Sequence, residues 1–223
     1  PFTRGREKSR EAQEIYSEVE QLVAQGAKEI ILLGQNVNAY GKRDMQRLTP
    51  FHELLYGVAE IPGVERLRFT TSHPKDFTKE TAHAFRDLDV LVNQLHLPVQ
   101  SGNNRILDGM RRGYSVEDYK TLVDLLRSEA PSIAFSTDII VGFPGETDDE
   151  FEDTLRLMDW VGYDSSYIFS YSPRPGTPAL EMEDSVSDAI KKDRLQATID
   201  LQKSLSDQNG KQYLGRQVEV LVE

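Results

Sequence analysis

The sequence predicts an α/β fold in which parallel strands alternate with helices, and two observations carry that prediction. Short apolar runs recur a few tens of residues apart, at 29–35, 66–72, 94–102, 134–145 and 166–172. Helical patterns fill the intervals, and repeated strand–helix–strand units join parallel strands through right-handed crossovers. Five such units in a row favour a barrel or partial barrel. No GxGxxG follows the first run, so a dinucleotide-binding fold has no support.

Apolar spacing and cap residues mark the first helices. Residues 10–25 place apolar side chains every three to four positions, and Gly26 is the expected stop. Thr49 and Pro50 predict an N-cap followed by proline at the first position of the next helix.

Two later helices begin with capping boxes, in which a hydroxyl and an acid three residues on satisfy backbone N–H groups reciprocally. The pairs are Ser115 with Asp118 and Thr147 with Glu150. A last helix, expected over 186–208, is long and heavily charged.

The pattern changes near residue 210. Residues 1–209 carry the α/β pattern, whereas KQYLGRQVEVLVE, from 211, alternates polar and apolar residues as a β-strand does. We therefore expect an α/β domain over 1–209 and the first strand of a truncated, β-rich domain over 210–223.

Charge restricts the classes of function. The chain has 26 basic and 37 acidic residues, a net charge of −11. Four basic residues and one acid lie within PFTRGREKSR at 1–10, so the remainder has 22 basic and 36 acidic residues. Because phosphate binding depends on Lys and Arg, such an acidic body disfavours broad nucleic-acid binding. Any RNA contact must come from local basic clusters or from another domain.

The absence of cysteine and of long apolar segments excludes further classes. Zero cysteines exclude a disulfide, a cysteine nucleophile and a thiolate metal site within these residues. The longest apolar runs, such as EIILLG at 29–34, are too short to cross a bilayer. We expect a cytoplasmic protein without a membrane partner.

Polar and glycine-rich loops follow every predicted strand. They are GQNVNAYG (34–41), TSHP (71–74), VQSGNNRILDGMRRGY (99–114), GFPGET (142–147) and PRPGTPA (173–179). Each loop alone is typical of ordinary turn and cap chemistry. Because the carboxyl ends of parallel strands meet at one edge, the set together indicates a polar ligand bound there. Asp138 is the one acid inside an apolar run, so a two-carboxylate acid–base mechanism is poorly supported.

Seven stretches in order carry a resemblance to a known family: RGREKSR, LLGQNVNAYG, RFTTSHP, HLPVQSGNNRIL, RRGY, TDIIVGFPGET and YSPRPGTPA. The chain resembles, over nearly its whole length, the methylthiotransferase branch of the radical S-adenosylmethionine (SAM) enzymes. GQNVNAYG and TTSHP are similar to members that act on isopentenyladenosine in tRNA. Members that act on threonylcarbamoyl-adenosine in tRNA, or on a ribosomal protein, are the alternatives.

The resemblance implies a partial (β/α)6 barrel with SAM and a [4Fe-4S] cluster at its mouth. Cleavage of SAM would yield a radical that takes hydrogen from C2 of N6-isopentenyladenosine at position 37, in the tRNA anticodon loop. A second [4Fe-4S] cluster in an N-terminal domain would supply sulfur, and a second SAM the methyl group. The family further implies a flavodoxin-type electron donor, a monomeric complete enzyme and a small, RNA-binding TRAM-like domain at the C-terminus.

The chain departs from the family in lacking the CxxxCxxC loop that holds the radical cluster. In the family this loop stands a few residues before the PFTRGRE-like stretch. We therefore expect the first barrel strand, the loop and the N-terminal domain to lie upstream of residue 1. The chain alone should be inactive, with no catalytic or metal-ligating side chain of its own. The open barrel edge also predicts poor solubility.

The resemblance assigns residue roles to the strand ends. Gln35 and Asn36 would bind the methionyl amino group of SAM, and Gln100 and Ser101 would bind the ribose or the carboxylate of SAM. Further cofactor-binding candidates are Asn38, Arg112 for the carboxylate, Val141, Gly142 and Tyr171 around the adenine, and Asp138 and His73 as organising residues. Candidates for tRNA phosphates, or for bracing the cluster loop, are Arg4, Arg6, Arg10 and Arg174.

Two other classes stay open on the residues alone. A metal-dependent barrel hydrolase could use His73, His96 and Asp138, although there is no HxH pair and no carboxylate-rich mouth. A non-catalytic RNA-binding module is the second, and the acidic body disfavours it.

Overall fold

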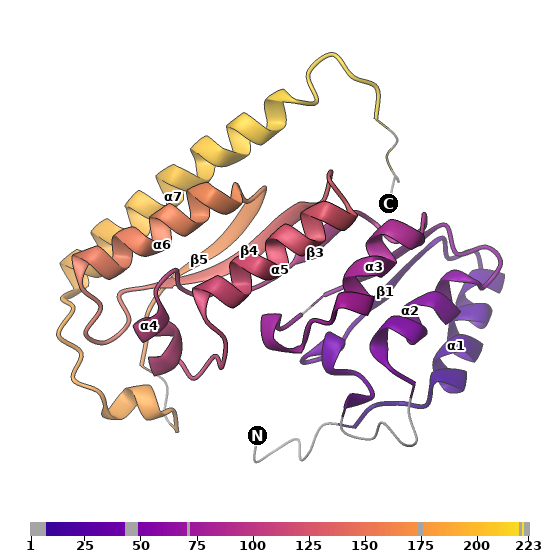
Figure 1. Ribbon diagram of the computed structural model, residues 1–223, viewed down its shortest axis with the longest axis horizontal. Coiled ribbons are helices and arrows are strands. Elements are labelled where there is room, and N and C mark those ends of the chain that lie inside the picture. Colours follow the sequence, from indigo (N-terminus) through magenta and orange to yellow (C-terminus); the bar gives the residue numbers. More distant parts are fainter. Residues whose placement is uncertain (1–7, 43–48, 71, 174–175, 219, 221–223) are drawn as a thin grey trace. The chain divides into compact units, whose positions relative to one another are not determined.

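The computed structural model describes residues 8–42, 49–70, 72–173, 176–218 and 220 (Figure 1). The chain forms two compact units. Unit 1 comprises Pro1–His96 and Leu122–Ile133, and unit 2 comprises Leu97–Thr121 and Ala134–Glu223. Helix α5 (Val116–Glu129) is divided between them.

Unit 1 is a small parallel sheet covered by helices. Its elements are α1 (Ala12–Ala24), β1 (Glu29–Leu32), η1 (Val37–Ala39), α2 (Phe51–Ala59), β2 (Arg66–Phe69), η3 (Pro74–Asp76), α3 (Lys79–Asp87) and β3 (Gln94–His96). Strands β1 and β2 pair in parallel, from Glu29 opposite Arg66 to Leu32 opposite Phe69. The Phe69 ring meets Phe51 of α2 edge-on at 5.1 Å and lies 5.8 Å from Phe85 of α3. Aromatic packing thus holds both helices on the sheet.

Unit 2 also packs helices on parallel strands, and its strands β4 (Ala134–Val141) and β5 (Ser165–Ser170) are longer than those of unit 1. Its other elements are α4 (Asn104–Gly109), α6 (Asp148–Val161), η4 (Pro178–Glu181) and α7 (Asp188–Lys211). Strands β4 and β5 pair in parallel, and the extended segment 97–100 runs along the other side of β4. Within the core, the Tyr119 hydroxyl donates to the Leu97 carbonyl at 2.9 Å and lies 2.8 Å from the Tyr163 hydroxyl. Burial raises the pKa of Tyr119 well above its ordinary value.

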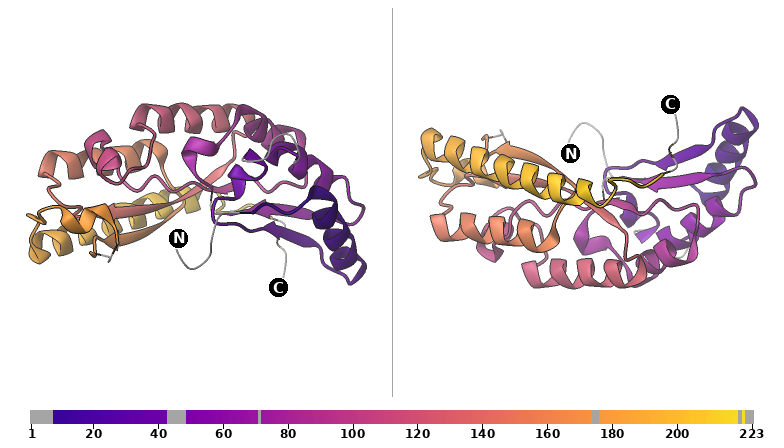
Figure 2. Two further views of the ribbon diagram at one scale, coloured as in Figure 1. Left: turned by 90° about the horizontal axis from the view of Figure 1, so that it is seen from below. Right: turned by 90° about the horizontal axis from the view of Figure 1, so that it is seen from above.

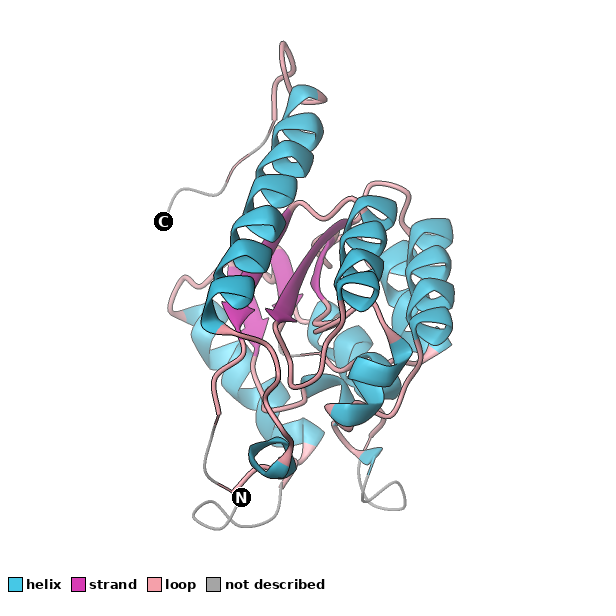
Figure 3. Ribbon diagram, turned by 90° about the vertical axis from the view of Figure 1, so that its left-hand side faces the viewer, coloured by secondary structure: helices cyan, strands magenta, loops and turns pink. Residues whose placement is uncertain are grey.

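Helix α7 packs on unit 2 through polar side chains rather than an apolar stripe. It lies alongside β5 in both views of Figure 2, and Figure 3 shows it as the long helix across the strands. Gln202 donates to the Tyr163 carbonyl at 2.9 Å, Ser206 to the Asp164 carbonyl at 2.8 Å and Asn209 to the Gly162 carbonyl at 2.9 Å. These bonds satisfy the backbone where α6 turns into β5, so a helix of low apolar content still docks firmly.

Most element predictions are confirmed. Each predicted strand overlaps an observed one, and Gly26 adopts φ +98° just after α1 ends. Both capping boxes form: Ser115 and Asp118 exchange bonds at the start of α5, and Thr147 and Glu150 do so at α6.

Two predictions of element boundaries differ from the structure. Thr49 is not an N-cap: Pro50 has extended backbone, with ψ 154°, and helix α2 starts at Phe51. The strand expected from 211 is absent among residues 211–218 and 220, because α7 continues to Lys211 and a turn follows. A lone strand has no partner with which to form ladder hydrogen bonds. Residues 219 and 221–223 lie outside the described part, and the second domain stays a prediction.

The capping box of α6 makes a pH-dependent contribution to stability. Both oxygens of Glu150 pair with the Arg105 guanidinium, and Oε2 also accepts from the Thr147 N–H at 2.8 Å. The hydrogen bonds from Arg105 lower the pKa of Glu150 to about 2, although partial burial opposes them.

We expect Glu150→Gln to lower the free energy of unfolding at pH 7, because the neutral amide no longer forms the ion pair with Arg105. The loss should be only about 1–2 kcal/mol, since the half-exposed Arg105 is partly screened by water. A carboxylate whose pKa is depressed stabilises the fold above its unfolded pKa, and this contribution is lost as pH falls through about 2. Thermal melting of both proteins between pH 7 and pH 2 should show the gap narrowing below the unfolded pKa. The exposed Glu152→Gln is the control, and a gap independent of pH would contradict the assignment.

No helix in the described part of the chain is both long enough and apolar enough to span a lipid bilayer.

Candidate functional site

In unit 1, Asn38 joins the loops that follow β1 and β2. Its Nδ2 donates to the His73 carbonyl at 3.0 Å, and its Oδ1 accepts from the His73 N–H at 2.8 Å. The Asn38 side chain therefore acts as a backbone-like partner, and the residue is only 5% exposed. His73 in turn caps η3, because its Nδ1 accepts from the Lys75 N–H at 3.3 Å. Asn38 and His73 thus hold together the loops that follow β1 and β2, and the first of these loops carries Gln35 and Asn36.

Asp76, which the sequence analysis did not single out, orients Asn36. The Asn36 Nδ2 donates to Asp76 Oδ2 at 2.5 Å, and Lys42 forms an ion pair with the same carboxylate. Burial alone would raise the pKa of Asp76, but hydrogen bonds from Lys42 and Asn36 outweigh it and leave that pKa below its ordinary value. An ionised carboxylate only accepts, so the amide nitrogen must face it. The Asn36 Oδ1 is buried and has no hydrogen-bond partner among the described residues.

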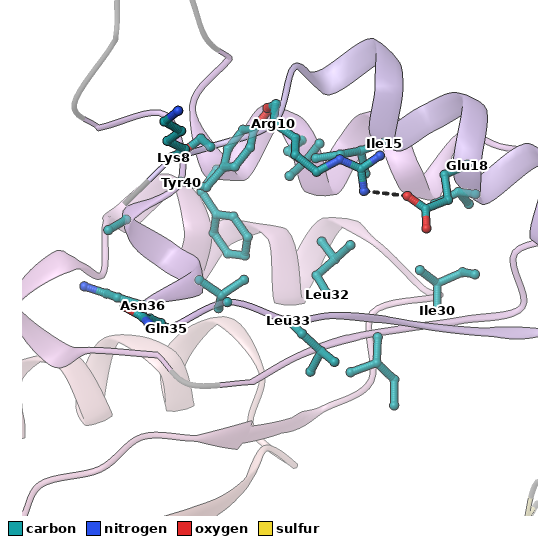
Figure 4. A pocket seen from close by; sticks show the side chains of 18 of the residues that line it. Lys8, Arg10, Ile15, Glu18, Ile30, Leu32, Leu33, Gln35, Asn36 and Tyr40 are labelled. Carbon is teal, nitrogen blue, oxygen red and sulfur yellow. Dashed lines mark hydrogen bonds and ion pairs between the residues drawn. The ribbon is translucent and has the colours of Figure 1, made fainter. Parts of the chain in front are cut away.

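A cavity of about 900 Å³ lies between α1 and β1 (Figure 4). Apolar side chains of α1, such as Ile15 and Val19, line one wall, and β1 forms the other. Gln35 and Asn36 lie at one end and Ile30 lies toward the other. Among the described residues no strand pairs with the edge of β1 that faces away from β2. The cavity therefore adjoins an edge of the sheet along which no described strand forms ladder hydrogen bonds.

In unit 2, Gln100 sits in a strained backbone conformation at the end of the extended segment beside β4. Its φ is +73°, a region that residues with a Cβ seldom adopt. Its N–H donates to the Asp138 carbonyl and its carbonyl accepts from the Ile140 N–H, both at 2.9 Å. Ser101 is fully buried, and its Oγ accepts from the Asn103 N–H and lies 3.4 Å from the Thr154 hydroxyl. The structure thus places the Ser101 hydroxyl within the loop framework rather than on an open surface.

The loop after β4 closes on a buried acid. Glu146 is 4% exposed, and its Oε2 accepts from the Gly142 N–H at 2.7 Å and from Arg194 Nη1 of α7 at 2.8 Å. Burial raises the pKa of Glu146, and the Gly142 N–H and Arg194 partly offset that effect. Gly142 has φ +72°, as a turn of this kind requires.

The remaining candidates of unit 2 lie on β4, directly after β5 and in the loop before α5. The Val141 carbonyl accepts from the Tyr171 N–H at 2.8 Å, and the Tyr171 hydroxyl is buried without a hydrogen-bond partner among the described residues. Arg112 donates through Nε to the Tyr114 hydroxyl at 3.4 Å. Asp138 is half-buried and faces the same side of the sheet as its register partner Tyr167.

The predicted RNA-binding residues are mostly outside the described part, which does not include Arg4, Arg6 and Arg174. Arg10 is described, and its Nη1 donates to Glu18 Oε2 of α1 at 2.5 Å. Its carbonyl accepts from the Tyr40 hydroxyl at 2.7 Å. Arg10 therefore braces the start of α1 against the loop after β1.

The described residues hold no cluster of three or more His, Cys, Asp or Glu side chains that could bind a metal ion. The sequence contains no cysteine, so no residue of this chain fits the thiolate ligation of a [4Fe-4S] cluster.

Four residues with structural roles in these loops were not predicted from the sequence: Asp76, Glu146, Lys191 and Arg194. Glu146 stands in the loop GFPGET and Asp76 lies two residues beyond the loop TSHP, and an acidic side chain beside a strand end was the available signal in each case. Lys191 and Arg194 gave none, since cations on a charged helix are normally solvated. Both are 6% exposed.

Comparison with known proteins identifies the superfamily to which the chain belongs. The Radical SAM superfamily profile matches residues 1–158. The chain belongs to the radical SAM superfamily.

Within this superfamily, the chain is similar in sequence to curated proteins that share one name. The chain is 50% identical over all 223 residues to the tRNA-2-methylthio-N(6)-dimethylallyladenosine synthase of Clostridium tetani, covering 49% of that protein. It is 51% identical to the synthase of the same name from Thermoanaerobacter sp., covering 47%, and 49% identical to that of Aquifex aeolicus, covering 50%. In each case all of this chain is matched. The chain spans about half the length of the curated relatives it matches.

Solved structures confirm the predicted fold class. Coproporphyrinogen III oxidase from Escherichia coli, a radical SAM enzyme, superposes with a TM-score of 0.61 at 20% identity, covering 87% of this chain and 46% of that one. The radical SAM methyltransferase TsrM from Kitasatospora setae gives 0.56 at 19% identity, covering 72% and 31%. At such identities the likeness concerns the fold alone, which is a partial α/β radical SAM barrel.

Proposed function

We propose that this chain is the radical SAM portion of a tRNA methylthiotransferase. The observation that carries the proposal is about 50% identity along all 223 residues to synthases that share one name, which specifies a 2-methylthio product on N6-dimethylallyladenosine in tRNA. The full-length protein would methylthiolate C2 of that base at position 37 of the anticodon loop. Action on threonylcarbamoyl-adenosine or on a ribosomal protein is the alternative within the same branch.

SAM is the cofactor that suits the groups at the strand ends. In unit 1, the Asn36 Oδ1 is an acceptor without a partner among the described residues, and Gln35 beside it is exposed. An amide oxygen of this kind suits the methionyl ammonium group. In unit 2, the candidates are the backbone of Val141 and Gly142 and the Tyr171 hydroxyl, which also has no partner in the described part. SAM and the reducing cluster together supply radical chemistry when bound.

Other candidates support the loops rather than the ligand. Asn38 and His73 hold the two loops of unit 1 together, and Ser101 holds the loop after Gln100. Gln100, Arg112 and Asp138 stay candidates for contact with SAM. Both [4Fe-4S] clusters must be bound by cysteines outside these residues, since the chain has none.

The free edge of β1 supports a further part of the proposal. The cavity of about 900 Å³ beside that edge has the apolar face of α1 as its wall. An additional parallel strand, followed directly by the cluster-binding loop, would bury both surfaces. We propose that the full-length protein supplies this strand from upstream of residue 1, and that a TRAM-like domain begins near residue 210.

The partners follow from the same proposal. Arg4, Arg6, Arg10 and Arg174 would contact tRNA phosphates or brace the cluster loop, although Arg10 is already paired with Glu18. A flavodoxin-type protein would donate the electron, and the enzyme would act as a cytoplasmic monomer.

The full-length protein, reconstituted with iron and sulfide, provides the test. It should convert tRNA bearing N6-isopentenyladenosine into the 2-methylthio product, detected by mass spectrometry of nucleosides, and release 5′-deoxyadenosine from SAM. Matched tRNA with unmodified adenosine at position 37 is the control. Product on threonylcarbamoyl-adenosine tRNA or on a ribosomal protein instead would support the alternative. Before reconstitution, metal analysis of the full-length protein as isolated that shows zinc without iron or acid-labile sulfide would overturn the proposal.

A further inference from the structure

Arg194 of α7 is buried beside the loop that follows β4. Its side chain is 7% exposed, and its guanidinium lies 5.4 Å from the centre of the Phe151 ring. Its Nη1 donates to Glu146 twice, to Oε2 at 2.8 Å and to the backbone carbonyl at 3.0 Å. Its Nη2 donates to Asp148 Oδ1 in the first turn of α6 at 2.7 Å. One side chain of α7 thus holds three acceptors of one loop.

Glu146 links Arg194 to the turn at the end of β4, because it accepts hydrogen bonds from both. The oxygen that accepts from Arg194, Oε2, also accepts from the Gly142 N–H at 2.7 Å. The neighbouring Val141 carbonyl accepts from the Tyr171 N–H at 2.8 Å. The Gly142 N–H and the Val141 carbonyl are therefore both hydrogen-bonded within the protein, and these two bonds restrain the turn in the absence of a ligand.

Lys191, one turn earlier on α7, restricts the same turn sterically. A Cβ added to Gly142 would lie 2.4 Å from Lys191 Cγ, and Gly142 has φ +72°. The Lys191 ammonium pairs with Asp184 Oδ2 at 2.5 Å and lies 5.6 Å from the centre of the Tyr171 ring. Two independent contacts of α7 therefore converge on Gly142.

A buried ion pair of this kind is a poor source of stability. Removing two charges from water costs free energy, and a well-packed apolar pair is often as stable or more so. What the Arg194–Glu146 pair supplies, and an apolar pair cannot, is a charged acceptor held at one point against the Gly142 N–H.

We propose that Arg194 is a positioning residue for the Gly142 turn, which it holds in the shape that receives SAM. This inference rests on the proposed function, because it takes the turn to be a contact for SAM. Arg194 itself touches no cofactor; it acts through Glu146.

The first readout is hydrogen–deuterium exchange of the Gly142 amide in the full-length protein without cofactors. Arg194→Met should increase the exchange rate about tenfold or more, because Glu146 loses its cation and no longer holds the amide. Arg156→Met is the matched control, since Arg156 pairs with Asp153 at 2.7 Å on the exposed face of α6. The control should leave the rate of Gly142 exchange unchanged.

The second readout is the Kd for SAM of the cluster-loaded protein. Arg194→Met should raise this Kd about tenfold or more, whereas Arg156→Met should leave it within about twofold. The double variant Arg194→Met/Glu146→Gln should recover part of both effects, because it leaves no unpaired buried charge and keeps an acceptor for the Gly142 N–H. Arg194→Lys replaces Arg194→Met if the latter fails to fold, and should show the same direction of change.

The outcomes separate the two proposals. Failure of the wild-type, cluster-loaded protein to bind SAM would overturn the proposed function, whatever the variants do. SAM binding by the wild type, with either Gly142 exchange or the Kd for SAM unchanged in the Arg194 variant, would overturn the positioning role. A lower melting temperature alone, with both readouts unchanged, would show that Arg194 is merely structural.

Discussion

Gly102→Ala should lower the free energy of unfolding by about 3 kcal/mol, because backbone atoms leave no room for a methyl group. A Cβ at this position would lie 2.5 Å from the Asp153 carbonyl oxygen and 2.6 Å from Thr154 Cα. Both atoms belong to the backbone of α6, so neither moves without displacing the helix. The Gly102 N–H also donates to the Thr154 hydroxyl at 3.0 Å, and this bond holds the Gly102 backbone close to α6.

The measurement is thermal or urea denaturation of the full-length protein, followed through the transition of the radical SAM domain. A loss of about 3 kcal/mol corresponds to a fall in melting temperature of roughly 6–12 °C for a domain of this size. Gly210→Ala is the matched control: Gly210 lies within α7, and in the described part of the chain no atom other than those of its two neighbours and its own helix backbone lies within 4 Å of the position that the alanine methyl group would take. That control should be neutral or slightly stabilising, since alanine favours helix. Equal effects at the two glycines would contradict the packing argument.

Asn38→Asp should destabilise the domain by about 2–4 kcal/mol at pH 7. The substitution removes the Nδ2 donor to the His73 carbonyl and sets a negative charge against that oxygen. At 5% exposure water cannot replace the lost donor. Because Asn38 connects the loops that carry Asn36 and Asp76, we also expect weaker SAM binding.

The pH dependence distinguishes this cause from general disruption. The protonated form of the introduced carboxyl group can donate to the His73 carbonyl and accept from its N–H, so it restores both bonds. Its folded pKa is therefore raised, and the stability of the variant recovers as pH falls below that value. The control is Asn93→Asp, at an exposed position where the amide lies 3.4 Å from the Ser132 hydroxyl. A deficit that does not shrink with acid would contradict the hydrogen-bond explanation.

Local sequence signals proved sufficient for most of the elements, although not for the strand expected from 211. Reciprocal capping at Thr147 and Glu150 depends only on side chains three residues apart, so the sequence alone located the start of α6. Apolar runs located all five strands for the same reason. The N-cap predicted at Thr49 was misplaced by one residue, because Pro50 itself is the N-cap and the helix starts at Phe51.

Long-range partners could not be predicted in the same way. Asp76 lies 40 residues from Asn36, and Arg194 lies 48 residues from Glu146. No pattern in either segment indicates the other. Helix α7 has the composition of a solvated helix, yet its polar side chains cover carbonyl groups that only the turn between α6 and β5 presents.

The sequence by itself determined the α/β class, the order of strands and helices, and the polar loops at the strand ends, because periodicity and capping are local properties. It also excluded cluster ligation by this chain, since no thiol is encoded. Only the tertiary structure decided which polar side chains of these loops are hydrogen-bonded within the chain. The side chains of Ser101 and Asn38 are hydrogen-bonded to neighbouring backbone groups, whereas Asn36 Oδ1 has no hydrogen-bond partner among the described residues. That distinction depends on where distant backbone N–H and C=O groups come to lie, and packing alone brings them together.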